Sequence, residues 1–304
     1  MEPSYLRLHA TGELARRTRK AVARLAGCGL CPRRCGADRL AGETGACGAG
    51  RRAVVASFNP HFGEEAVLVG RGGSGTVFFA GCSLGCVFCQ NHDISRHGSA
   101  GIEATPEELA GVMLDLQRRG CHNINVVTPT HVVAQILEGL AVAVEHGLSL
   151  PLVWNSGGYD LPETLALLDG VVDIYMPDVK VWDPGEAQRL LGARDYPEHA
   201  RRAVAAMHRQ VGDLVVEDGL AVRGLLVRHL VLPGGLSGSG QWMEFLAGLS
   251  RQTWVNLMEQ YHPCGGARYL PPLDRLITRA EFAAALAEAR KQGLTRLDGQ
   301  GVIK

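Results

Sequence analysis

The sequence lacks a charge imbalance, a long apolar run and a targeting signal. Its 31 basic and 31 acidic residues leave no net charge, so no basic field points to nucleic acid or to an anionic membrane. No apolar run approaches the roughly 18 residues that a membrane span needs, and the N-terminus has no basic-then-apolar signal pattern. These absences predict a cytoplasmic protein that acts away from membranes and nucleic acid.

The sequence also lacks the pattern of a disulfide framework. Its nine cysteines are odd in number and are clustered at metal-like spacings, which indicates a reducing compartment. The 304 residues, 46% of them hydrophobic, suffice for a full-sized core. Length alone suggests roughly two domains, but α/β barrels of about 200–250 residues fold as one.

The most informative stretch is Cys82–Cys89, which follows the apolar run Thr76–Gly81. That run is typical of a buried strand, so the cysteines of this C-x3-C-x2-C pattern should occupy the loop at its C-terminal end. Iron–sulfur clusters are normally held by four thiolates, so three thiolates predict an open iron for a substrate or cofactor. A zinc site would need a fourth ligand at typical spacing, and His92 follows too closely.

Together with the aromatic Phe88, these cysteines resemble the signature of the radical S-adenosylmethionine (radical SAM) enzymes. The resemblance implies a [4Fe-4S] cluster on Cys82, Cys86 and Cys89, with S-adenosylmethionine (SAM) on the open iron. It also implies that an electron from the cluster cleaves SAM to a 5′-deoxyadenosyl radical. The alternatives are a zinc site or a chance run of core thiols.

A second cysteine group lies near the N-terminus at C-x2-C-x3-C-x11-C spacing, in a segment rich in glycine and arginine; its members are Cys28, Cys31, Cys35 and Cys47. Four thiolates suit a closed zinc site or a second iron–sulfur cluster, and spacing does not decide between them. Four free thiols on a loop are the other alternative. The segments Leu-Cys-Pro-Arg-Arg-Cys and Gly-Glu-Thr-Gly-Ala-Cys resemble the N-terminal segment of uncharacterised radical SAM proteins similar to pyruvate formate-lyase activating enzymes.

Strands and helices are predicted to alternate after about residue 75. Six strands are expected at residues 76–81, 123–127, 150–154, 171–176, 225–232 and 253–258. Helices are expected at residues 11–26, with Thr11 as the N-cap, and at 105–119, 131–146, from 162, 184–211, 241–249 and 279–292. A connecting strand is expected at residues 53–58.

This alternation predicts a parallel sheet, interpreted as a partial (β/α)6 TIM-like barrel with an N-terminal cysteine-rich extension. The extension is assigned to residues 1–70 and the barrel to residues 71–304. The chemistry of such barrels lies on the loops at the C-terminal ends of the strands. An open doubly wound sheet is the alternative, although no G-x-G-x-x-G follows the first strand.

The resemblance covers roughly residues 28–265 and is closest to activating enzymes of the pyruvate formate-lyase type. It implies SAM contacts from Phe88, from Asn155-Ser156 after the third strand, and from Asp178-Val179-Lys180 after the fourth. The group's Gly-Gly-Glu-Pro segment is absent, and residues 127–131 replace it, so carbonyls or hydroxyls there, with Thr128 as the candidate, are expected to contact SAM. His229, beside Arg228, lies near where the group has a basic SAM contact. Asp178 and Lys180 could instead form a rim ion pair, and His229 could be a satisfied core histidine.

Four other chemically capable positions are given less specific roles. Cys121 is predicted to be a buried thiol, whereas Cys264 is either structural, a hydrogen-atom donor or a metal ligand. His61 and the pair Glu64-Glu65 are predicted to be structural or solvated.

The predicted function is hydrogen abstraction by a SAM-derived radical, with a reductant such as flavodoxin or ferredoxin and with a protein or peptide as substrate. The resemblance suggests activation of a glycyl-radical enzyme. The alternative is an iron–sulfur electron-transfer protein or a zinc-binding adaptor, and SAM cleavage separates the two.

Overall fold

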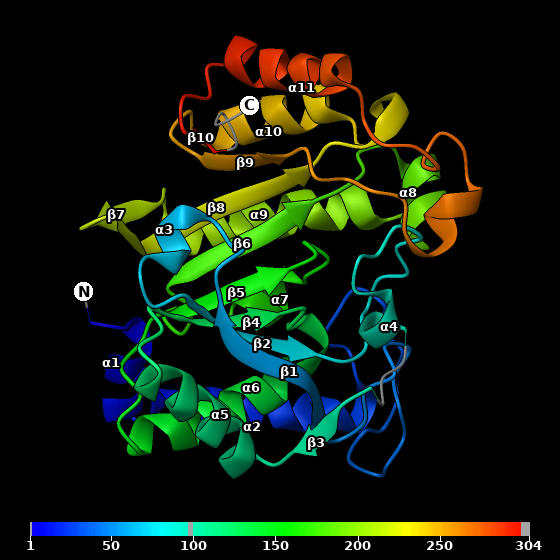
Figure 1. The fold of residues 1–304 in the computed structure, drawn as a ribbon. Coiled ribbons are helices and arrows are strands. Elements are labelled where there is room, and N and C mark those ends of the chain that lie inside the picture. Colours follow the sequence, from blue (N-terminus) through cyan, green and yellow to red (C-terminus); the bar gives the residue numbers. More distant parts are fainter. Residues whose placement is uncertain (1, 97–99, 299–304) are drawn as a thin grey trace.

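A computed structural model describes residues 2–96 and 100–298 of the chain (Figure 1). Within them ten strands form one sheet, in which β10-β9-β8-β6-β5-β4-β2-β1-β3 are successive neighbours and β7 pairs with β8. The strands are β1 Ala53–His61, β2 Ser74–Phe79, β3 Ile102–Ala104, β4 Ile124–Val127, β5 Leu152–Ser156, β6 Ile174–Val179, β7 Val215–Glu217, β8 Leu220–Leu230, β9 Trp254–Met258 and β10 Leu297–Asp298.

The six predicted strands are confirmed as β2, β4, β5, β6, β8 and β9, and each neighbouring pair is parallel. The sheet stays open, because its outermost strands, β3 and β10, do not pair with each other. This is the expected α/β architecture, a partial TIM-like barrel. The predicted connecting strand is β1, which pairs antiparallel with β2 and carries β3 on its other edge. The short strands β3, β7 and β10 were not predicted.

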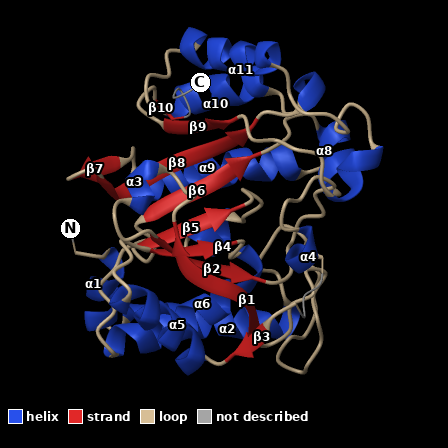
Figure 2. Cartoon of the chain, in the orientation of Figure 1, coloured by secondary structure: helices blue, strands red, loops and turns tan. Residues whose placement is uncertain are grey.

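Helices cover the sheet mainly on one face, as Figure 2 shows for α7 and α9 behind β5, β6 and β8. The α-helices are α1 Ser4–Ala10, α2 Glu13–Ala23, α3 Ala66–Val69, α4 His92–Ser95, α5 Pro106–Arg118, α6 Val133–Glu145, α7 Pro162–Leu165, α8 Pro184–Leu191, α9 Tyr196–Val211, α10 Ser239–Leu249 and α11 Arg279–Lys291. The short helix α3 lies on the opposite face, in front of β6 and β8 (Figure 1). None of the helices in the described part of the chain has both the length and the apolar character to cross a membrane.

Two apolar clusters lie on the two faces of the sheet. The smaller one joins Leu68 of α3 to Ile174, Met176 and Leu226. The larger one joins the intervening strand residues, such as Tyr175 and Val227, to the covering helices. Because successive side chains of a strand alternate between faces, neighbouring residues such as 228 and 229 belong to opposite sides.

Helix caps explain where the expectations for helices hold and where they are wrong. Thr105 caps α5 as predicted: its hydroxyl accepts from the Glu108 N–H at 3.1 Å, and the Glu108 carboxylate accepts from the Thr105 N–H at 2.7 Å. The prediction that Thr11 is the N-cap of a helix at residues 11–26 is wrong. Thr11 follows the end of α1, and Gly12, with φ of 74°, separates α1 from α2.

The N-terminal helices pack on the barrel. The Tyr5 hydroxyl donates to the Leu150 carbonyl at 2.7 Å, and Tyr5 and Leu14 belong to the larger apolar cluster. The boundary near residue 70 stays a prediction.

Candidate active site

The loop Cys82–Cys89 leaves the C-terminal end of β2 and is fixed through its backbone. The N–H groups of Gly85 and Val87 donate to the carbonyls of Leu191 and Leu190 at the end of α8, both at 2.9 Å. The Arg96 guanidinium donates to the carbonyls of Gly85 at 2.8 Å and Cys86 at 3.1 Å. Main-chain contacts therefore hold the loop, and the cysteine sulfurs are left for other bonds.

All three cysteines of this loop are free thiols. The residues are partly exposed as a whole, but their sulfurs lie deep enough that burial raises the pKa of Cys82 to about 12 and that of Cys86 to about 11. The Lys180 ammonium nearby opposes this rise. Within residues 2–96 and 100–298, no three His, Cys, Asp or Glu side chains are already arranged to coordinate a metal. Thiols must lose their protons to become ligands.

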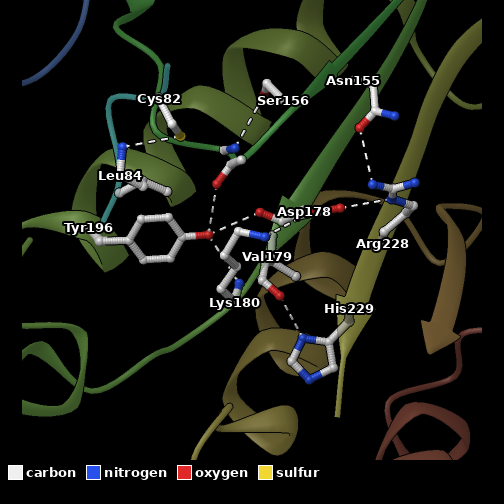
Figure 3. Close-up of polar contacts among 12 residues, drawn as sticks. Cys82, Leu84, Asn155, Ser156, Asp178, Val179, Lys180, Tyr196, Arg228 and His229 are labelled. Carbon is white, nitrogen blue, oxygen red and sulfur yellow. Dashed lines mark hydrogen bonds and ion pairs between the residues drawn. The ribbon is translucent and has the colours of Figure 1, made fainter. Parts of the chain in front are cut away.

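The cysteine loop meets the loops after β5 and β6. A Cβ atom on Gly157 would lie 3.1 Å from Leu84 Cδ1 and 3.6 Å from Lys180 Cε. Figure 3 shows the Tyr196 hydroxyl between these loops: it contacts the carbonyls of Gly157 at 3.1 Å and Asp178 at 2.9 Å, and accepts from the Lys180 N–H at 3.0 Å. Cysteines, Gly157 and Lys180 therefore line one edge of the sheet.

Asp178 is the centre of a buried ionic cluster. Its carboxylate accepts from Lys180 Nζ and from Arg228 Nε, each at 2.7 Å. Burial alone would raise the pKa of Asp178, but the Arg228 and Lys180 cations lower it to about 2. Asp178 is therefore ionised at neutral pH.

Arg228 links this cluster to two other parts of the chain. Besides Asp178, it donates to Asn155 Oδ1 and to Glu64 Oε2, both at 3.1 Å. Figure 3 shows the contacts of Arg228 with Asp178 and Asn155. Register explains the arrangement, since Asp178, Arg228 and Asn256 lie opposite one another on β6, β8 and β9. Burial raises the pKa of Glu64, and Arg228 opposes that rise.

The structure favours the core interpretation of His229 over a cofactor contact. Its Nδ1 is 2.9 Å from the Val179 carbonyl, its Nε2 is 2.9 Å from Ser239 Oγ, and the residue is fully buried. Burial lowers the pKa of His229 to about 4, so the ring is neutral. Strand alternation turns Arg228, and not its neighbour, toward the ionic cluster.

Ser156 and Thr128 shape the loops around the site. The Ser156 hydroxyl donates to Asp160 at 2.6 Å, and Thr130 donates to the other oxygen of the same carboxylate at 2.8 Å. Thr128 has φ of 58°, in the left-handed region that β-branched residues rarely adopt, and its N–H donates to the Asn155 carbonyl at 2.9 Å. Such strain is concentrated at functional sites, which supports a role for the Thr128 backbone here.

Phe88, a residue of the cysteine loop, contacts the segment that follows β9. The Phe88 ring is buried and packs edge-on against Tyr261, with centroids 6.4 Å apart. The Cys264 thiol donates to the Phe88 carbonyl at 3.3 Å. Cys264 therefore adjoins the cysteine loop as its position after β9 suggested, and Cys121 is buried as predicted.

A pocket of about 210 Å³ adjoins the ionic cluster. Its wall includes Glu64, Glu65, Arg228 and Asn256, and Asn256 Nδ2 donates to Glu65 at 2.7 Å. Arg228 is common to the pocket and to the cluster. The pocket offers polar space beside the site for part of a ligand.

Sequence reasoning missed three contributors to this cluster: Arg228, Glu64 and Tyr196. Arg228 was considered only together with His229, and strand alternation could have separated them had the register been known. Glu64 was predicted to be structural or solvated, and it is buried beside Arg228, 164 residues away in the chain. Tyr196 carries no sequence signal that distinguishes it from a core aromatic.

The N-terminal cysteines also come together. Cys28, Cys31 and Cys47 are buried and Cys35 is exposed. A Cβ atom on Gly45 would lie 3.3 Å from Cys35 Sγ and 3.4 Å from Cys47 Sγ. Burial raises the pKa of Cys31 to about 12, and the three other thiols of the group add to that rise.

Comparison with known proteins gives two matches. The Radical SAM superfamily matches residues 76–222, a span that contains both the cysteine loop and Asp178–Lys180. An uncharacterised protein of Methanocaldococcus jannaschii is 32% identical over 276 residues, which cover 88% of this chain and 75% of that protein.

Proposed function

We propose, from the premise that this chain belongs to the radical SAM superfamily, that it abstracts hydrogen from a protein or peptide, in the manner of glycyl-radical-enzyme activases. Members of this superfamily are enzymes that use a [4Fe-4S] cluster and SAM and that need a reductant. The finer assignment, a protein substrate, rests on the resemblance of the sequence to activating enzymes.

The donor set fits the cluster. Three thiols on one backbone-held loop, Cys82, Cys86 and Cys89, would hold three irons and leave the fourth open. When bound, the reduced cluster supplies the electron that cleaves the SAM sulfonium. The nearby Lys180 ammonium would stabilise the thiolate forms of the buried Cys82 and Cys86, whose neutral forms burial otherwise favours.

The ionic cluster would bind and orient SAM. The Asp178 carboxylate can accept from a ribose hydroxyl or an ammonium group, and Lys180 can donate to a carboxylate. Charge-assisted contacts of this kind are each worth about 1.5–3 kcal/mol when shielded from water. Arg228 and Tyr196 would act as positioning residues, because both already hold Asp178 or its backbone.

The convergence of Leu84, Gly157 and Lys180 is the observation that carries the proposal. It brings the cysteine loop, the Asn155-Ser156 loop and the Asp178–Lys180 loop to one edge of the sheet. A zinc-binding adaptor or a simple electron-transfer protein has no need of a buried ionic cluster beside its thiols.

SAM turnover by the reduced protein tests the proposal. Anaerobically reconstituted protein, reduced with dithionite, should release 5′-deoxyadenosine and methionine from SAM, and SAM should perturb the EPR signal of the reduced cluster. A Cys86→Ala variant should do neither, and Cys121→Ser, with the same number of cysteines lost, should do both. Iron-loaded protein without any SAM cleavage would support the adaptor alternative instead.

The remaining assignments are part of the same proposal. Flavodoxin or ferredoxin would supply the electron, and the free, clustered cysteines suit a cytoplasmic location. Phe88, Thr128, Asn155 and Ser156 would shape the SAM site. Deuterium transfer from a labelled glycyl-radical enzyme into 5′-deoxyadenosine would support the protein substrate, whereas transfer from a labelled small molecule alone would contradict it.

A further inference from the structure

A buried arginine in the N-terminal segment has no anionic partner. Arg39 is 0% exposed, and its guanidinium donates to the carbonyls of Gly50 and His131, each at 2.8 Å. No carboxylate pairs with it in the described part of the chain, and its Nη2 atom is buried without a hydrogen-bond partner. A buried charge without a counterion is strongly unfavourable, so an anion is expected beside it.

The nearest groups that can become anions are the N-terminal thiols. Arg39 Nη1 lies 3.8 Å from Cys28 Sγ. Two further thiols of the group converge on Gly45, where a Cβ atom would lie 3.3 Å from Cys35 Sγ and 3.4 Å from Cys47 Sγ. Converging thiols beside a buried cation are the environment of a metal ligand.

The N-terminal cysteine segment also contacts the Cys82–Cys89 loop and the residue before it. Arg33 donates to the Ser83 carbonyl at 2.8 Å and to the Gly192 carbonyl at 2.7 Å. The Cys47 carbonyl lies so close to Gly81 that a Cβ atom there would approach it to 2.4 Å. Residues on both sides of Cys82 are therefore in contact with the N-terminal cysteine segment.

A third connection runs through His131. Its backbone carbonyl accepts from Arg39, and its Nε2 lies 2.8 Å from the Ala80 carbonyl. Ala80, Gly81 and Ser83, which surround Cys82, are thus contacted by His131, Cys47 and Arg33 respectively.

We infer that the N-terminal segment binds a thiophilic metal centre through four thiolates and that this centre fixes the loop carrying Cys82; the ligands are Cys28, Cys31, Cys35 and Cys47. Each thiol releases its proton to solvent when the metal binds. With Zn²⁺, or with a [4Fe-4S] cluster in its 2+ state, four thiolates leave a dianion, which supplies the missing counterion of Arg39. This inference does not depend on SAM chemistry.

The metal is tested in full-length protein that carries Cys82→Ala, Cys86→Ala and Cys89→Ala, so that the second site is measured alone. Mass spectrometry of the metals should find one zinc per chain, or about four irons with sulfide if the centre is a cluster. Adding Cys31→Ser should remove most of this metal, and adding Cys121→Ser should not. Protein purified from zinc- and iron-supplemented medium without either metal would overturn the inference.

The coupling is tested with Arg33→Ala, which keeps all the cysteines, and with Arg34→Ala as the matched control. Arg34 is adjacent but pairs with Glu163, and among the described residues it makes no hydrogen bond to the Cys82–Cys89 loop. Arg33→Ala should keep the N-terminal metal, yet hydrogen exchange at Gly85 and Val87 should quicken by about tenfold or more, with no change in Arg34→Ala. Equal exchange in both variants would overturn the coupling. Wild-type protein that fails to cleave SAM would contradict the proposed function and leave these readings intact.

Discussion

The two cysteine groups differ in burial and in their charged neighbours. In the Cys82–Cys89 loop the nearby cation, Lys180, already has the Asp178 carboxylate as its partner. In the N-terminal group the cation is Arg39, which pairs with no carboxylate within residues 2–96 and 100–298. The first group has three thiols beside a balanced ionic cluster, and the second has four beside an unbalanced charge.

This difference predicts different roles for the two cysteine groups. In a site with three thiols and a balanced set of charged side chains, these side chains can exchange their ion-pair partners for groups of a bound ligand. A site with four thiols around an isolated buried cation is most stable when it is closed and filled. The contrast predicts catalysis at the first group and a supporting role at the second.

Replacing the cysteines of each group should have the largest effects and tests this contrast directly. Cys82→Ala, Cys86→Ala and Cys89→Ala together should abolish SAM cleavage, because no thiolate remains to hold the irons. The single variant Cys31→Ser should keep measurable cleavage but lower the melting temperature, since a structural metal contributes to folding. Chromatographic detection of 5′-deoxyadenosine and calorimetry give the two readings. Cleavage by the triple variant, or none by Cys31→Ser when it is folded and iron-loaded, would remove the distinction.

Asp178→Asn should weaken SAM binding by roughly 10- to 100-fold, because about 1.5–3 kcal/mol of charge-assisted contact is lost. Iron content should stay at the wild-type level, since the cysteine loop is held by its own backbone contacts. Titration of SAM into reconstituted protein measures the effect. Asp169→Asn, a change at an exposed aspartate, is the control. Unchanged affinity would make Asp178 a purely structural residue.

The stability that Asp178 contributes should depend on pH. Its folded-state pKa of about 2 lies below the ordinary value of 3.8, so the contribution is complete above about pH 4 and is lost as the pH falls toward 2. The difference corresponds to about 2 kcal/mol. Denaturant unfolding should therefore show that the difference in unfolding free energy between the wild type and Asp178→Asn narrows below pH 4. A difference of constant size would contradict an ionised Asp178.

His229→Gln should distinguish a core role of His229 from a role in binding SAM. Burial lowers the folded-state pKa of His229 from 6.5 to about 4, so wild-type stability should fall as the pH drops from about 6.5 toward 4. The variant should lose part of that pH dependence, by about 3 kcal/mol at most, and should bind SAM as the wild type does. A marked loss of SAM affinity with normal iron content would restore His229 to the cofactor site.

Thr105→Ala gives the scale of a defect that touches neither cysteine group. Loss of the cap of α5 should lower the unfolding free energy by about 1 kcal/mol, with iron content and SAM cleavage unchanged. Thr278→Ala removes the equivalent capping box of α11 and should have a similar effect. A change in iron content in either variant would show that the metal sites respond to general loss of stability.

Much of the fold follows from local patterns. The apolar runs at residues 123–127 and 171–176 contain or overlap β4 and β6, and Thr105-Pro106 marks the start of α5 because capping involves only the next few residues. Short edge strands such as β3 and β7 carry little periodicity and were missed. The helical stretches predicted at residues 184–211 are α8 and α9, and Gly192 in the left-handed conformation ends the first of them. Glycine permits that conformation without requiring it, so the sequence did not fix where α8 ends.

The sequence by itself determined the two cysteine groups and the alternation of strands and helices, since both are written in spacing and in local apolar period. Only the tertiary structure decided which side chains meet. Arg228 reaches Glu64 across 164 residues, and Arg33 reaches the carbonyl of Ser83 across 50. Such contacts depend on strand register and on the face each residue occupies, and these are set by burying the whole sheet at once. The position of one cysteine group against the other is therefore a property of the fold.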